Sequence, residues 1–118
     1  MIEGQDAGSA AADRAGDYAG LPADQRIEAV ARLWEAHLRA PFPPRLRGLD
    51  IAGVEMILLD ADIAGCVSVW LDSNGQLDDW RRTAVASCLR QLDLVQPLLA
   101  GQEAAYYRRL RDLAELIA

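Results

Sequence analysis

The chain has 118 residues, a formal net charge of −6 at pH 7 and a hydrophobic content of 52%, which are ordinary values for one globular domain. These values exclude a chain that is disordered throughout, because enough apolar side chains are present to form a core. The acidic balance repels phosphate backbones and therefore disfavours general nucleic-acid binding.

Arginine supplies all 12 basic side chains, since the sequence contains no lysine. Arginine, alanine and glycine have GC-rich codons, so this usage indicates a bacterial gene from a GC-rich genome and carries no functional argument. Residues 1–20 are small, acidic and interrupted by glycines, and they lack the apolar segment that a signal peptide contains. We therefore expect residues 1–20 to be a disordered tail and the protein to be cytoplasmic.

The first expected helix spans residues 23–40, because Ile27, Val30 and Trp34 recur at helical spacing. Pro41 ends this helix, since proline lacks the backbone N–H that a helix interior requires. One side of the helix should face the core and the other side should face water.

Residues 41–53 form a connection that is long for a compact domain, and such loops are often functional or packed over the end of a core. The segment Pro-Phe-Pro-Pro-Arg at 41–45 also has the composition of a polyproline-II ligand. Packing is the better-supported interpretation, because Phe42, Leu46 and Leu49 add apolar side chains that can cover a core.

Residues 54–71 are the most apolar stretch of the sequence. On a helix, at about 100° per residue, apolar side chains fall on nearly every side, which is typical of a helix surrounded by other elements. The carboxylates Glu55, Asp60 and Asp62 argue against a membrane span. Gly65 either weakens this helix or permits close approach of a neighbouring one. A β-hairpin over the same residues is the alternative, since short apolar runs cannot be assigned from periodicity alone.

A breaker cluster from Asp72 to Asp78 follows, and two further helices come after it. Both have apolar side chains at alternating spacings of three and four residues. The sequence predicts an all-α fold, a compact four-helix bundle forming a single domain over residues 21–118. If the hairpin alternative held, the fold would be α+β. The expected helices lie near residues 23–40, 54–71, 77–97 and 102–117.

The sequence offers no recognisable catalytic or metal-binding constellation. His37 is the only histidine, and it lies on the apolar side of the first helix beside Trp34. Cys66 and Cys88 lie within apolar patterns and form no Cys-x-x-Cys motif. We therefore expect no catalytic group, no metal, no cofactor, and two buried reduced thiols.

Asp60 requires an explanation, because on a helix it lies among apolar side chains, where an unpaired charge is costly. One interpretation is a structural ion pair with an arginine such as Arg45, Arg47 or Arg81. The other is a ligand-binding site made by Asp60, Arg45 and Arg47, with the proline-rich loop as a lid.

The sequence favours a non-catalytic protein–protein interaction module, most simply a homodimer, over an enzyme. This hypothesis rests on apolar surface expected around four aromatic residues, Trp70, Trp80, Tyr106 and Tyr107. A small-ligand or enzymatic bundle using Asp60 is the first alternative. DNA binding through residues 77–91 is the second, with phosphate contacts from Arg81, Arg82 and Arg90.

Overall fold

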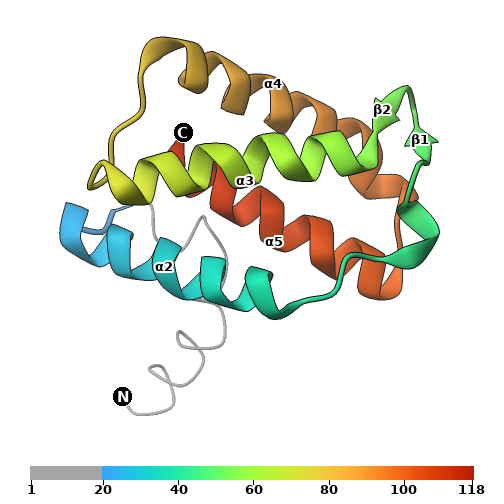
Figure 1. The fold of residues 1–118 in the computed structure, drawn as a ribbon, viewed down its shortest axis with the longest axis horizontal. Helices are drawn as coiled ribbons and strands as arrows, with labels where there is room; N and C mark the ends of the chain where they lie inside the picture. The colour runs from blue at the N-terminus through green and yellow to red at the C-terminus, as the bar shows by residue number, and fades with distance from the viewer. Residues whose placement is uncertain (1–19) are drawn as a thin grey trace.

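The computed structural model describes residues 20–118, and this part of the chain forms four α-helices and one small β-hairpin (Figure 1). The prediction of a helical bundle is confirmed, whereas the strands precede the central helix and do not replace it. The tail expected over residues 1–20 lies outside the described residues except for Gly20. In chain order the elements are α2 Ala23–Arg39, the 3-10 helix η2 Pro44–Leu46, β1 Asp50–Ile51, β2 Val54–Glu55, α3 Met56–Asp72, α4 Asp79–Val95, η3 Gln96–Leu98 and α5 Gly101–Ile117.

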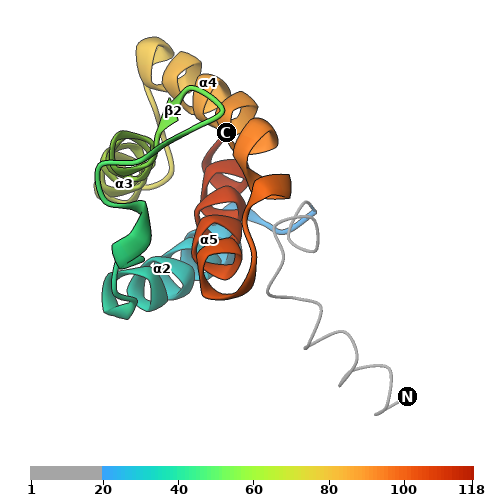
Figure 2. The same cartoon turned by 90° about the vertical axis from the view of Figure 1, so that its right-hand side faces the viewer.

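The helix at the centre of the bundle is α5. It packs against α2, α3 and α4, and Figures 1 and 2 show α2 and α4 on opposite sides of α3 with α5 behind them. Its buried side chains are large and lie on several sides of the helix, which is what three neighbours require. They include Tyr106, Tyr107, Leu110, Leu113 and Ile117.

The central apolar helix α3 is packed on one side and open on the other. Met56, Leu59, Ile63 and Val67 are at most 1% exposed and face the core. The opposite side is exposed, so the prediction that this helix is surrounded by other elements is wrong for that side. The physical reason is that α2, α3 and α4 form a layer around α5, and a helix in such a layer keeps one face free. Within residues 20–118, no helix is both long and apolar enough to cross a membrane.

A tight hairpin delivers the chain from the proline-rich loop into α3. Ile51 pairs with Val54, and the turn residues Ala52 and Gly53 have φ values of 52° and 80°. Two positive φ values match the twist of a two-residue hairpin turn. The Glu55 side chain then accepts a 2.7 Å hydrogen bond from the Leu58 N–H, which caps the start of α3.

The turn after α3 follows the expectation from its sequence. Asn74 and Gly75 both adopt positive φ, at 60° and 96°, and the Gly75 N–H donates a 2.7 Å hydrogen bond to the Trp70 carbonyl. This geometry satisfies a carbonyl at the helix end, because residues that tolerate positive φ can fold the chain back over it. The turn therefore places α4 antiparallel to α3.

Candidate functional site

Asp60 joins three helices through its carboxylate. Its Oδ1 atom lies 3.1 Å from His37 Nε2 on α2, and its Oδ2 atom accepts a 2.7 Å hydrogen bond from the Tyr106 hydroxyl on α5. An ionised carboxylate can only accept hydrogen bonds, so His37 Nε2 then carries a proton. The side chain of Asp60 is 17% exposed, and both oxygens have partners, so this cluster accounts for a carboxylate at a largely enclosed position.

The arginine partner predicted for Asp60 is wrong. Asp60 faces α2 and α5, where a histidine and a tyrosine are the polar groups within reach. Arg45 instead pairs with Glu103, and Arg81 pairs with Asp78 at 2.8 Å.

The aromatic rings around Asp60 protect this cluster from water. His37 is 5% exposed, stacks on Trp34 at 5.8 Å and lies 4.7 Å from the Tyr106 ring. Burial, reinforced by the hydrogen bond to Asp60 and by its charge, raises the pKa of Tyr106. The Tyr106 hydroxyl therefore stays protonated at neutral pH and remains a hydrogen-bond donor.

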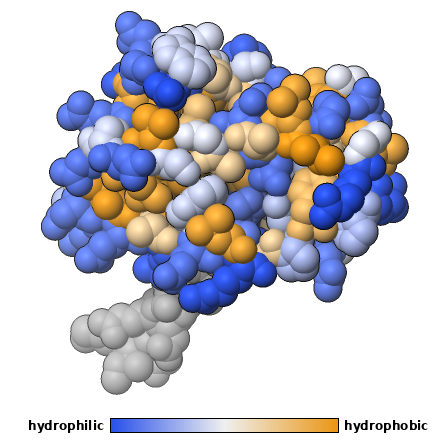
Figure 3. Space-filling view, viewed as in Figure 1, coloured by the Kyte–Doolittle hydropathy of each residue, from blue (hydrophilic) through white to orange (hydrophobic). Residues whose placement is uncertain are grey.

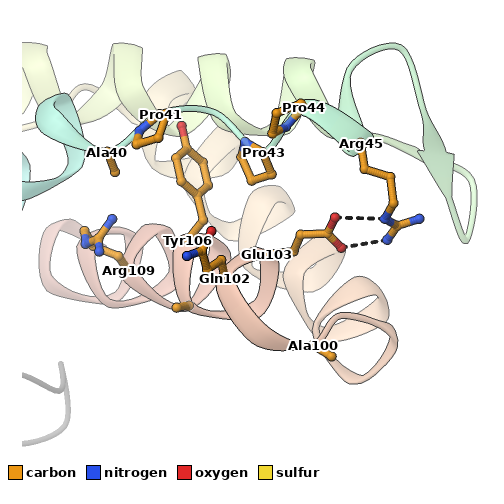
Figure 4. Close-up of a pocket in the computed structure, with 11 residues that line it drawn as sticks. Ala40, Pro41, Pro43, Pro44, Arg45, Ala100, Gln102, Glu103, Tyr106 and Arg109 are labelled. Carbon is orange, nitrogen blue, oxygen red and sulfur yellow. Dashed lines mark hydrogen bonds and ion pairs between the residues drawn. The ribbon is translucent and has the colours of Figure 1, made fainter.

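A cavity of about 790 Å³ opens beside this cluster, between the proline-rich loop and α5 (Figure 4). This volume is within the range of small-molecule sites. Tyr106 is the link between the two features, because its ring lines the cavity while its hydroxyl binds Asp60. The wall is mainly apolar. It consists of Ala40, Pro41, Pro43, Pro44, Arg45, Ala100, Gln102, Glu103, Ala105, Tyr106 and Arg109.

The two arginines of this cavity have different surroundings. Arg45 donates two hydrogen bonds to the Glu103 carboxylate, at 2.7 and 2.8 Å, so its charge is already paired. The hydrogen bond from Arg45 lowers the pKa of Glu103 and keeps that carboxylate ionised. Arg109 lines the other end, and its Nη1 atom is buried with no hydrogen-bond partner within residues 20–118.

Of the three ligand-binding residues predicted from the sequence, the structure places one in the cavity wall. Arg45 lines the cavity, Asp60 lies behind Tyr106, and Arg47 stacks over the Phe42 ring at 5.6 Å. Arg109 belongs to a cluster with Arg108 and Arg111 for which a solvated helix face was the favoured prediction from the sequence. The spacing of these arginines does not separate Arg109 from Arg111, which pairs with Asp93.

Three of the four aromatic residues predicted to form an interface are buried in the chain's own core. Trp70, Tyr106 and Tyr107 are 5%, 7% and 0% exposed, so the prediction that they provide free apolar surface is wrong. Tyr106 packs against His37 of α2, and the Tyr107 hydroxyl donates a 2.7 Å hydrogen bond to the Met56 carbonyl at the start of α3. Gly75, in the turn after α3, lies close to the Trp70 ring. Trp80 is 64% exposed, and the Arg81 guanidinium lies 4.4 Å from its ring centroid.

Large exposed apolar side chains lie on α2, α3, α4 and η3, namely Leu38, Ile57, Leu58, Trp80, Leu94 and Leu98. On α3, several small residues are exposed beside Ile57 and Leu58. Over this helix, patches of orange and pale atoms interrupt the blue surface in Figure 3. Asp62 and Asp72 are its only exposed charges, whereas α2 exposes Glu28, Arg32 and Glu35, among others. We call this surface the outer face of α3. It consists of Ile57, Leu58, Ala61, Ala64, Gly65, Ser68 and Leu71, all exposed or half-buried.

The described residues offer little for metal or thiol chemistry. No group of three or more histidine, cysteine, aspartate or glutamate side chains within residues 20–118 could hold a metal ion. Cys66 and Cys88 are free and buried. Burial raises the pKa of the Cys88 thiol to about 11, so at neutral pH it is protonated and a poor nucleophile.

Comparison of the chain with protein-family models, with curated proteins and with solved structures gives no match. Functional inference therefore depends on the geometry of the chain itself, above all on the outer face of α3 and the cavity beside α5.

Proposed function

We propose that this protein is a non-catalytic interaction module that forms a homodimer through the outer face of α3. The observation that carries the proposal is an apolar helix face with no covering element within residues 20–118. Ile57 and Leu58 are 39% and 57% exposed on this face, and contiguous exposed apolar surface is typical of an interaction site.

The order of residues along the outer face favours a second copy as the partner. Consider a second copy of α3 packed antiparallel to the first, with a twofold axis that passes between Ala64 and Gly65. Each residue before the axis then faces the residue that lies equally far after the axis on the other copy. Such an axis generates the self-complementary contact of a symmetric dimer. The resulting pairs are Ala64 with Gly65, Ala61 with Ser68, Leu58 with Leu71, and Ile57 with Asp72.

The sizes of these side chains suit two crossing helices. The small residues lie at the middle, where the two backbones approach most closely, and the leucines lie towards the ends, where the gap is wider. A side chain added at Gly65 would meet nothing within 4 Å in the monomer, so this position is open towards the partner. A helix of this length spans about 25 Å. Side chains of α2 and α4 beside it must therefore contribute to the roughly 800 Å² per partner that a stable interface needs.

The decisive variant is Gly65→Arg, because the open position tolerates a large side chain in the monomer and the dimer does not. Replacing glycine inside a helix also favours the helix by up to about 1 kcal/mol. The matched control is Ala86→Arg, which adds the same charge on the exposed side of α4. Sedimentation velocity over about 1 μM to 1 mM protein covers the range of affinities expected for a moderate interface.

We expect the wild type and Ala86→Arg to dimerise and Gly65→Arg to remain monomeric with an unchanged circular dichroism spectrum. A wild type that stays monomeric over the whole range contradicts the proposal. Equal dimerisation of wild type and Gly65→Arg also contradicts it, since the interface would then lie elsewhere.

DNA binding through residues 77–91 has less support from the contacts of its arginines. Arg81 pairs with Asp78, and Arg82 donates a 3.2 Å hydrogen bond to the Leu77 carbonyl. These contacts occupy donors that a phosphate would require. A gel-retardation experiment at low salt tests this alternative, and we expect no shift of the DNA.

A further inference from the structure

Arg109 carries a buried guanidinium nitrogen that has no acceptor within residues 20–118. Its Nη1 atom is enclosed and makes no hydrogen bond within the described part of the chain, while the residue itself lines the cavity beside α5. A buried donor on a charged group is costly unless an acceptor meets it. Arg45, in the same cavity, has its acceptor in Glu103. The unmet interaction is therefore confined to the Arg109 end of the cavity.

The cavity wall on α5 has an acidic residue at one end and a basic residue at the other. Glu103, Tyr106 and Arg109 of α5 all line the cavity, and Figure 4 shows Tyr106 rising between the other two. Six residues of helix separate the acidic end from the basic end by about 9 Å. A ligand with one acidic group is therefore directed to Arg109, because at the opposite end Arg45 is already bound to Glu103.

The rest of the wall is suited to an apolar body. Pro41, Pro43 and Pro44 form the loop side, and Ala105 and the Tyr106 ring form the helix side. Three prolines also restrict the backbone of this loop, so little conformational entropy is lost when a ligand binds against it.

We propose that this cavity binds a small apolar monocarboxylate, with its carboxylate on the Arg109 guanidinium and its hydrocarbon body between the prolines and Tyr106. The carboxylate pairs with the guanidinium of Arg109, which lines the cavity, and a charge-assisted hydrogen bond of this kind is stronger than a neutral one. Asp60 does not contact the ligand. It positions the Tyr106 ring through the hydroxyl hydrogen bond of 2.7 Å.

The probe for this site is octanoate, compared with octanamide, which has the same chain and a neutral head group. Both are titrated into the full-length protein labelled with ¹⁵N, and binding is followed by amide chemical shifts. We expect saturable shifts at Gln102, Tyr106 and Arg109 with octanoate, and at least tenfold weaker binding of octanamide.

The variant Arg109→Gln removes the charge while keeping a side chain that can pack. Arg108→Gln is the matched control, since Arg108 is the exposed neighbour on α5 and does not line the cavity. We expect octanoate to bind Arg109→Gln at least tenfold more weakly and Arg108→Gln as tightly as the wild type. Amide spectra of the free variants establish that both are folded.

Three results overturn this proposal: no saturable shift with octanoate, equal affinity for octanamide, or unchanged octanoate affinity in Arg109→Gln. The proposal does not depend on dimerisation. Gly65→Arg, which tests the outer face of α3, should bind octanoate with wild-type affinity.

Discussion

Helices α3 and α5 have the same length and opposite surroundings. Helix α5 carries polar side chains such as Gln102, Arg108 and Glu115 outward, and three neighbouring helices cover the rest of it. Helix α3 is the more apolar of the two, yet its outer face is uncovered. Each of the two helices packs against three others. The comparison teaches that apolar content measures how much surface a helix needs to bury, whereas the arrangement of its neighbours determines how much the monomer can bury. On α3 the apolar surface is larger than the area that neighbouring helices cover. The apolar surface left uncovered is the basis for the proposed dimer.

The largest expected difference between the two helices is in the response to truncation of a leucine. Leu110 on α5 is fully buried, and Leu110→Ala should lower the free energy of unfolding by about 2–5 kcal/mol through the cavity it creates. Leu58 on the outer face of α3 is 57% exposed, and Leu58→Ala should change monomer stability by less than about 0.5 kcal/mol. Urea denaturation at low protein concentration, where the monomer dominates, measures both.

A loss at Leu58 equal to the loss at Leu110 would show that the outer face of α3 is packed within the monomer. The same pair of variants can be measured at high protein concentration. There, Leu58→Ala should destabilise further, because a dimer that binds only the folded state adds stability by mass action.

A smaller effect is expected at Asp60, which links the inner side of α3 to α2 and α5. Asp60→Ala should lower the free energy of unfolding by about 1–3 kcal/mol, because it leaves His37 and Tyr106 without their acceptor. Asp60→Asn keeps one acceptor oxygen and should lose less. Thermal or urea unfolding measures both variants.

The same Asp60 variants separate a structural role from a ligand-binding one. Asp60→Asn should leave octanoate affinity within about twofold of wild type, since the position of Tyr106 is largely retained. A loss of binding as large as that expected for Arg109→Gln would mean that Asp60 contacts the ligand directly.

The helices were predictable from the sequence because their signals are local. Apolar spacing defined α2 and α5, Pro41 marked the end of α2, and the breaker cluster from Asp72 to Asp78 marked the turn after α3, where Asn74 and Gly75 adopt positive φ. These signals depend on neighbours within about four residues, which is the range of helical contacts.

The site was less predictable because its contacts are distant in the sequence. Asp60 meets His37 across 23 residues and Tyr106 across 46 residues, and helix periodicity does not specify which side chains meet across a bundle. The same limit explains the error at Trp70, Tyr106 and Tyr107. Periodicity assigned them to helices, but it could not show that other elements cover them.

The smallest expected effect concerns the inner side of α3, where it faces α4. Cys66 and Cys88 lie on these two helices, and burial raises the pKa of both thiols, that of Cys88 to about 11 from an ordinary value of 9.0. A raised pKa means that the folded state holds the proton more tightly than the unfolded state. The contribution to stability is therefore complete below pH 9 and is lost as the pH rises from 9 towards 11.

The variant Cys88→Ala isolates this contribution from the ionisation of other groups. The loss of stability between pH 8 and pH 10 should be about 1 kcal/mol smaller in the variant than in the wild type, because the unfolded wild-type chain gains free energy by ionising this thiol. Urea denaturation at intervals of half a pH unit measures the difference. If the two curves are parallel, Cys88 ionises as readily in the folded state, and the contact between α3 and α4 admits water. In that case the inner side of α3 would differ less from its outer face than the burial of Cys66 and Cys88 indicates.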